Sequence, residues 1–353
     1  MKYEIKKIVK NKMLIILFLI SIIVSVFVAL KGLSYDGLFK SFDEEYENPS
    51  SGSYKYMLDY YDSVKEYREK ICRIADRLIN SPDENVVALN SKIKDSYDDE
   101  LSFVTVFYTL FVDRSIGNGS NIGTPLFLIL FLAVVAQMFY TDVSNDMICM
   151  LRTTYRTKKV FWNKIKCIFL ISGLISVLKV AIDFLPQWMY GDIIDLTNPI
   201  QCLELFKESP YNISILSFIG IKVLLIMLSL LTTGIIIIAF ANILKKLPKL
   251  ITAVLLTGGI TYYMYYYLTR VNYVSLIGIT EDDRWFTNIV RRFTTVFTLF
   301  EPGSFFVKAE YINIFGMPVR LLTVTVTSSV VFVVIMVFVC RYLYLRRDVN
   351  VRS

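Results

Sequence analysis

The chain contains no histidine. Histidine is the commonest general base near neutral pH, so its absence excludes the usual catalytic triads and histidine-containing zinc sites. No GxxxxGK[ST] sequence occurs either, so the chain has no recognisable nucleotide-binding loop. We therefore predict no catalytic residue, no metal site and no cofactor bound by the chain itself.

Cysteine is also scarce and has no CxxC spacing. The five cysteines are Cys72, Cys149, Cys167, Cys202 and Cys340. We interpret them as thiols, because their scattered positions match neither a metal site nor a disulfide framework. Cys72 and Cys202 form the one pair on the predicted outer side that could be joined by a disulfide.

Polar sequence is limited: 55% of the 353 residues are hydrophobic, and the mean hydropathy is +0.52. These values exceed those of a soluble domain of this length. Six apolar runs have roughly the length of a bilayer core. They cover residues 13–30, 125–140, 167–184, 213–240, 250–268 and 321–340. We predict an all-α polytopic membrane protein with six transmembrane helices.

Basic residues indicate the orientation of these spans. With both termini in the cytoplasm, the inner segments hold 18 Lys or Arg in 60 residues, whereas the outer segments hold 17 in 172. Because basic residues beside membrane spans stay in the cytoplasm, this difference favours cytoplasmic N and C termini.

Residues 1–31 are predicted to form an amphipathic elbow helix on the inner leaflet, followed by the first span. The apolar residues Ile5, Ile8 and Val9 lie between lysines, a pattern typical of interfacial helices. Two alternatives remain open. The basic start could simply orient the span, or the span could be a signal peptide cleaved near Gly32.

Residues 32–123 are predicted to form an extracellular helical hairpin domain. This block holds 17 Asp or Glu against 10 Lys or Arg, a net charge of −7, so the rest of the chain carries +14. Apolar residues recur every three or four positions on both sides of residues 81–84, where Ser81 is the expected N-cap and Pro82 the first helical residue. Its acidic surface is either a solvated face or a site for a cationic peptide.

Residues 124–353 are predicted to form the transmembrane domain with spans 2 to 6. Between the last two spans, residues 285–307 follow the pattern of two outer helices, broken at Glu301, Pro302 and Gly303. Such apolar helices are expected to enter the outer leaflet or pack on the spans.

Several ionisable and tyrosine residues lie within the spans. Lys179 and Asp183 are four residues apart and are expected to pair locally, while Lys222 could extend its amine to the outer surface. Alternatively these three residues line a substrate cavity together with Tyr262 and Tyr266, although an interfacial aromatic belt also explains the tyrosines.

Residues 140–166 form a charged island between two apolar runs, with six Lys or Arg and two Asp. Its pattern is an acid just past the second span, then a leucine, an arginine and a lysine that opens the third span. These residues are Asp142 with Asp146 beside it, Leu151, Arg156 and Lys164. With the six spans and the broken outer helices, the chain resembles the membrane subunit of type-2 ATP-binding-cassette exporters. It departs from that pattern at residues 144–145 and 153–155, which lack the common glycine and proline.

The resemblance implies a permease subunit that works with a separate ATPase, which binds ATP and Mg. It also implies a second permease chain, as a homodimer or heterodimer, in a bacterial plasma membrane. The expected substrate is an amphipathic or lipophilic molecule such as an antimicrobial peptide or a drug. The cytoplasmic coupling loop would be residues 141–166, and its ATPase-coupling residues would be Asp142, Asp146, Leu151, Arg152, Arg156 and Lys164. The partners are thus an ATPase, another permease chain and membrane lipid, with no nucleic acid.

Two other functions fit the same sequence. The chain could be a membrane sensor or immunity protein whose hairpin binds a cationic peptide, without transporting anything. It could also be a secondary transporter driven by an ion gradient, for which Asp183 would be the membrane-embedded acid.

Overall fold

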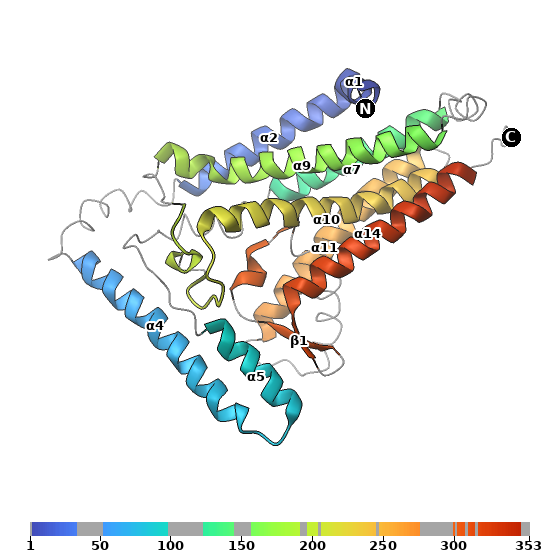
Figure 1. Cartoon of the computed structure of the whole chain (residues 1–353). Coiled ribbons are helices and arrows are strands. Elements are labelled where there is room, and N and C mark those ends of the chain that lie inside the picture. Colours follow the sequence, from blue (N-terminus) through green and yellow to red (C-terminus); the bar gives the residue numbers. More distant parts are fainter. Residues whose placement is uncertain are drawn as a thin grey trace.

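The computed structural model describes residues 2–33, 52–97, 123–144, 157–190, 196–203, 206–244, 247–275, 299–300, 302–307, 310–314 and 317–346. The described chain is mostly helical (Figure 1). The long apolar helices are α2 (Lys12–Leu33), α7 (Gly123–Ser144), α9 (Thr157–Tyr190), α10 (Ile215–Ile243), α11 (Leu247–Ser275) and α14 (Leu321–Arg346). The remaining helices are α1 (Lys2–Lys10), α4 (Gly52–Ile79), α5 (Glu84–Tyr97) and the 3₁₀ turns η1 (Ile200–Cys202) and η3 (Pro302–Phe306).

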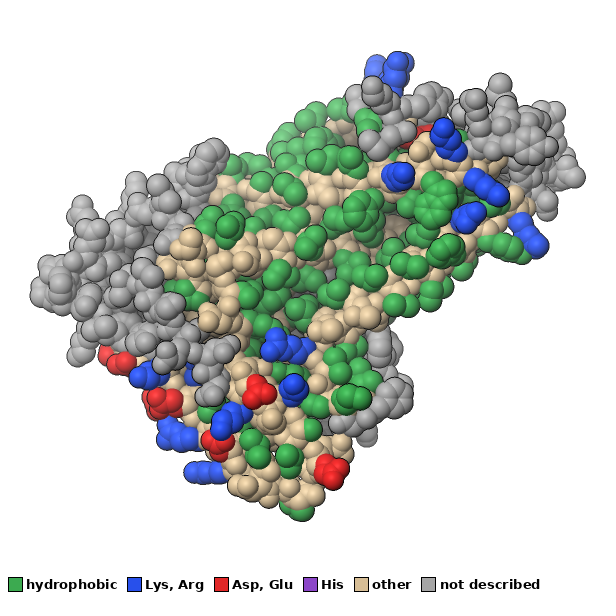
Figure 2. Space-filling view, viewed as in Figure 1, with side chains coloured by type: hydrophobic (Ala, Val, Ile, Leu, Met, Phe, Trp, Pro, Cys, Tyr) green, Lys and Arg blue, Asp and Glu red, His purple; other side chains and the backbone are tan. Residues whose placement is uncertain are grey.

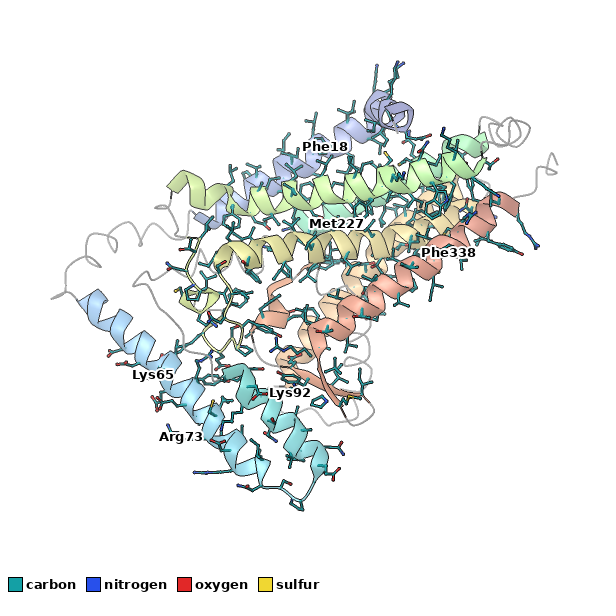
Figure 3. All side chains as sticks on the ribbon, viewed as in Figure 1. Phe18, Lys65, Arg73, Lys92, Met227 and Phe338 are labelled. Atoms are coloured by element: carbon teal, nitrogen blue, oxygen red, sulfur yellow. The ribbon has the colours of Figure 1, made fainter. Side chains whose placement is uncertain are left out.

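Within the described residues, three helical segments are long and apolar enough to cross a membrane: Thr157–Leu185, Ile215–Ile243 and Leu321–Arg346. Two shorter apolar segments, Lys12–Phe27 and Thr124–Tyr140, belong to α2 and α7. The outer faces of α2 and α14 are apolar, since Phe18 on α2 and Phe338 on α14 are exposed and point away from the bundle (Figure 3). The protein is therefore a mostly helical membrane protein.

Helix α10 lies at the centre of the bundle and packs against α7, α9, α11 and α14. Its contact with α7 depends on Gly234, because a Cβ atom at that position would lie 2.7 Å from Cε1 of Phe131. Met227 of α10 faces α9, where its sulfur lies 3.6 Å from the Cβ position of Gly173 (Figure 3). Small residues thus bring the helix backbones close together.

Helices α4 and α5 pack together as a hairpin beside one end of the bundle (Figure 1). Helix α5 begins at Glu84, and Oδ1 of Asp83 accepts a hydrogen bond of 2.9 Å from the backbone N–H of Asn85. The prediction that Ser81 is the N-cap is therefore wrong, and Asp83 has that position. Aspartate is at least as good a cap as serine, and this start places Glu84 in the first turn, where the helix dipole favours it.

The all-α prediction missed a small antiparallel ribbon formed by β1 (Tyr311–Ile314) and β2 (Met317–Arg320). Tyr311 pairs with Arg320, and Ile314 pairs with Met317. The sequence does contain a signal for it: two short runs with β-branched residues stand on either side of Phe315–Gly316, and a glycine-containing pair is typical of a hairpin turn.

The molecule thus has two distinct ends. We call the "hairpin end" the region of α4, α5, residues 196–203 and 206–214, η3 and the β1–β2 ribbon. We call the "terminal end" the region of α1, the last turn of α7, the first turns of α9 and the last turns of α14. The two ends lie at opposite ends of the long helices (Figure 1).

Candidate functional site

Lys164 is the central residue of the terminal end. It lies on α9 and is fully buried, with its Nζ 3.8 Å from Oε2 of Glu4 on α1. The same Nζ donates a hydrogen bond to the carbonyl oxygen of Met138 on α7 and lies 5.1 Å from the ring centre of Phe139. One lysine therefore joins α1, α7 and α9.

The burial of Lys164 changes its predicted role. A buried cation is tolerated only with compensating partners, and here these are a carboxylate, a carbonyl and an aromatic face. In this conformation Lys164 cannot reach a separate protein directly. We therefore infer that Lys164 holds α1, α7 and α9 together at the terminal end rather than contacting an ATPase.

Asn11 fixes the turn between α1 and α2. Its side-chain oxygen accepts a hydrogen bond of 3.0 Å from the backbone N–H of Met13, so it acts as the N-cap of α2. Its side-chain nitrogen donates to the side-chain oxygen of Gln137 on α7. The angle of α1 is thus set by two contacts, one at Asn11 and one at Glu4.

The last turns of α14 pack against α7 and α9 at the terminal end. The rings of Phe139, Phe161 and Tyr344 lie with their centres 5.4–6.2 Å apart, and all three are fully buried. Nearby, the guanidinium of Arg341 lies 5.9 Å from the ring of Trp162. A displacement of the end of α7 or the start of α9 would therefore also displace α1 and α14.

The other predicted coupling residues cannot be placed by their side chains. Asp142 lies on the last turn of α7, but its side chain is outside the described part of the structure. Asp146, Leu151, Arg152 and Arg156 lie entirely outside the described residues. Their role in coupling stays a prediction.

Inside the bundle, two lysines share one aspartate. The Nζ of Lys179 lies 2.6 Å from Oδ2 of Asp183 on the same helix, as the local-pair prediction expected. The Nζ of Lys222 on α10 lies 3.6 Å from the same oxygen. Lys222 is fully buried, so the prediction that it extends to the outer surface is wrong. Its link to Asp183 depends on how α9 meets α10, which residue spacing within one helix does not reveal.

The predicted cavity tyrosines Tyr262 and Tyr266 are only partly described. Tyr262 is on α11, is 46% exposed and packs its ring edge-on against Phe300 at 6.0 Å. The side chain of Tyr266 is outside the described part of the structure. The described contacts therefore do not join the tyrosines to the lysine–aspartate cluster in one site.

The predicted outer helix break is a buried 3₁₀ turn. Pro302 and Gly303 begin η3 and are buried, and Phe305 and Phe306 of the same turn belong to a second apolar core. Burial in protein satisfies the requirement that non-helical backbone at a membrane be shielded from lipid. Glu301 and residues 276–298 lie outside the described residues.

The hairpin is fixed to the loop that precedes α10. Arg68 of α4 is buried and donates a hydrogen bond of 3.3 Å to the carbonyl oxygen of Ser209. Tyr97 of α5 donates one of 2.9 Å to the carbonyl oxygen of Glu208. The guanidinium of Arg68 also lies 5.5 Å from the ring centre of Tyr97, so the two contacts support each other.

A second set of contacts ties the hairpin to the ribbon. The hydroxyls of Ser96 and Tyr311 are 2.6 Å apart, and Nη2 of Arg320 donates to Oγ of Ser96 at 3.3 Å. Arg320 also lies 5.2 Å from the ring of Tyr211, and burial raises the pKa of that phenol. Sequence analysis missed this junction, because its residues come from three segments far apart in the chain.

The two helices of the hairpin are not acidic. Residues 52–97 hold eight Asp or Glu and eight Lys or Arg, so their net charge is zero. The net charge of −7 of residues 32–123 therefore comes from the flanking segments outside the described residues. Exposed ion pairs such as Arg73 with Glu69 and Lys94 with Asp76 further balance the surface.

Other site types are not evident in the described ranges. No group of three or more Cys, Asp or Glu side chains there could hold a metal ion, and the four described cysteines are thiols. No protein-family model, curated protein or solved structure matches the chain.

Proposed function

We propose that the chain is the membrane-spanning permease subunit of an ATP-binding-cassette transporter in a bacterial plasma membrane. In this proposal α2, α7, α9, α10, α11 and α14 are six spans, and both termini are cytoplasmic. A separate ATPase supplies energy through residues 141–166, and a second permease chain completes the transporter. The cargo is an amphipathic or lipophilic molecule, such as an antimicrobial peptide or a drug.

The grouping of segments supports the proposed topology. The three segments with low basic density, 32–123, 185–212 and 269–320, contact one another at the hairpin end through Arg68, Ser209 and Arg320 and their neighbours. Segments with high basic density meet at the terminal end, where Glu4 contacts Lys164 and Tyr344 contacts Phe161. Charge density and three-dimensional position thus agree on the same two sides.

The observation that carries the coupling proposal is the buried junction at Lys164. Lys164 belongs to the predicted coupling segment 141–166 and holds α1, α7 and α9 together. Such a junction converts a push on the loop into a joint displacement of three helices instead of a local bend. That is the mechanical property which a permease driven by an external ATPase needs.

The test is to purify the full chain in mild detergent from the cells that naturally produce it, and to measure bound nucleoside-triphosphatase activity. Asp142→Arg and Arg156→Glu are expected to lose the ATPase while the chain remains folded. Arg73→Glu on the exposed face of α4 is the matched charge reversal and should retain it. An intact chain with no ATPase bound would refute the proposal, and transport that survives ATP depletion but stops with the proton gradient would replace it with ion-driven transport.

The second candidate is a sensor or immunity protein that binds a peptide at the hairpin. The observation in its favour is that the hairpin contacts β2, which continues directly into α14. Binding of a cationic peptide by the full chain, with no ATP-dependent efflux in vesicles, would favour this candidate. Because the hairpin helices have no net charge, we rank it second.

A further inference from the structure

Exposed lysines surround the terminal end. Lys6, Lys10, Lys12, Lys158, Lys159 and Lys166 are all exposed, and we call them the "lysine collar". They come from α1, the start of α2 and the first turns of α9, which pack together. Figure 2 shows basic side chains gathered at this end, whereas the hairpin end carries both signs.

The collar has no exposed acidic counterpart among the side chains that the structure describes at this end. Glu4 is the acidic side chain there, and it is 5% exposed because it packs against Lys164. The positive charge of the collar is therefore directed outward. It requires a partner of negative charge or remains hydrated.

An apolar surface begins directly beside the collar. Met13 is 75% exposed and Phe169 is 57% exposed, and they follow Lys12 and Lys166 along α2 and α9. Trp162 is 37% exposed and stands between Lys159 and Lys166 in the sequence. Lysines that extend toward water and a tryptophan at the boundary are typical of the level of lipid headgroups.

We propose that the lysine collar binds the phosphate headgroups of anionic phospholipids, whose acyl chains lie along the exposed faces of α2 and α9. Charge selects the headgroup, and the adjacent apolar face selects a lipid over a soluble anion. The interaction fixes the depth of α1, because Lys6 and Lys10 face outward while Ile5 and Ile8 pack on the core. This inference rests on membrane embedding and holds whether or not the chain works with an ATPase.

Trp162 provides a local probe for the test. The full chain with Trp188→Phe and Trp285→Phe retains Trp162 alone, and it is reconstituted into phosphatidylcholine vesicles containing brominated phosphatidylglycerol or brominated phosphatidylcholine. We expect bromine on the anionic lipid to quench Trp162 at lower mole fraction, with a preference of at least about fivefold, the value for one engaged lysine. Salt at 0.5 M should remove most of the preference, because the Debye length then falls to roughly 4 Å.

The matched variants locate the preference. Lys158→Gln, Lys159→Gln and Lys166→Gln together remove the collar lysines on the helix that carries Trp162 and should remove most of the preference. Lys65→Gln, Lys70→Gln and Lys92→Gln remove the same charge from the hairpin end and should leave it intact. Equal quenching by both lipids in the parent protein would overturn the proposal and leave the collar to an acidic protein partner. A preference that is undiminished in the collar variant would also overturn it. Should that variant fail to fold, the salt titration of the parent decides.

Discussion

Different forces hold the segments together at each end of the molecule. At the terminal end, a buried lysine with one carboxylate joins three helices, and the surrounding surface has only exposed basic charge among its described side chains. At the hairpin end, hydrogen bonds from Arg68, Ser96 and Tyr97 and aromatic contacts join three distant segments, and the charges of the hairpin helices cancel.

This difference indicates different tasks. Removing one partner of a buried ion pair leaves an uncompensated charge, so the terminal end resists separation of its helices. The junction at the hairpin end divides its binding energy among several contacts of modest strength, each worth about 1 kcal/mol. The terminal end is thus held by one strong buried ion pair, and the hairpin end by several weaker contacts.

The largest effect is expected from Asp183, which serves Lys179 and Lys222 together. Asp183→Asn leaves two buried ammonium groups without a carboxylate and should lower the free energy of unfolding by about 3–5 kcal/mol. Chemical denaturation in mixed micelles measures this loss. The double variant Asp183→Asn with Lys222→Met should recover much of the stability, and a wild-type value for Asp183→Asn alone would show that the cluster is not buried.

The ion pair of the terminal end is expected to come next. Lys164→Met removes the ion-pair partner of the buried Glu4 carboxylate and a hydrogen bond to the carbonyl oxygen of Met138, at a cost of about 2–3 kcal/mol. Adding Glu4→Gln should restore part of it, since the remaining buried group is then neutral. A double-mutant cycle by thermal unfolding gives the coupling energy, and purely additive losses would argue against a direct contact.

The junction of the hairpin end should be weaker. Arg68→Ala and Tyr97→Phe each remove one hydrogen bond to the loop before α10 and should cost about 1–2 kcal/mol. Hydrogen exchange should rise in α4 and α5 but not in α10 or α14. Arg73→Ala, which removes an exposed ion pair and an exposed hydrogen bond to Glu69, is the control and should change stability by less than about 0.5 kcal/mol. Equal exchange in all three variants would mean that the hairpin is not docked through these residues.

The smallest effect concerns the turn within the hairpin. Asp83→Ala removes the N-cap of α5 and should cost about 1 kcal/mol, whereas Ser81→Ala should cost less than half of that. Thermal unfolding of the full chain compares the two directly. A larger loss for Ser81→Ala would restore serine as the cap.

Contacts within one helix could be predicted from the sequence, and contacts between helices could not. The pair Lys179–Asp183 follows from a spacing of four residues. Each apolar run falls on one long helix, although α9 begins at Thr157, well before its run at 167–184. The link of Lys222 to Asp183 and of Glu4 to Lys164 depends on which helix faces meet. Hydrophobicity does not encode that choice in α10, which is apolar on every side.

Competition between neighbouring signals in the sequence explains the other differences between the predictions and the structure. Ser81 and Asp83 are both good caps two residues apart, so the pattern alone could not choose between them. The β1–β2 ribbon was overlooked because its strands have four residues each and follow a segment expected to be helical. The coupling role of Asp142, Asp146, Leu151, Arg152 and Arg156 follows only from the family resemblance and stays a prediction, since their side chains lie outside the described part of the structure.

The direct continuation of β2 into α14 has a mechanical consequence. β2 ends at Arg320 and α14 begins at Leu321, whose backbone N–H donates a 2.9 Å hydrogen bond to the carbonyl oxygen of Glu310, just before β1. The 26 residues of α14 form a rod of roughly 39 Å, and no loop separates it from β2. A torque applied to the ribbon by the hairpin must therefore tilt the whole rod, and the ring of Tyr344 at its far end would shift against Phe139 and Phe161.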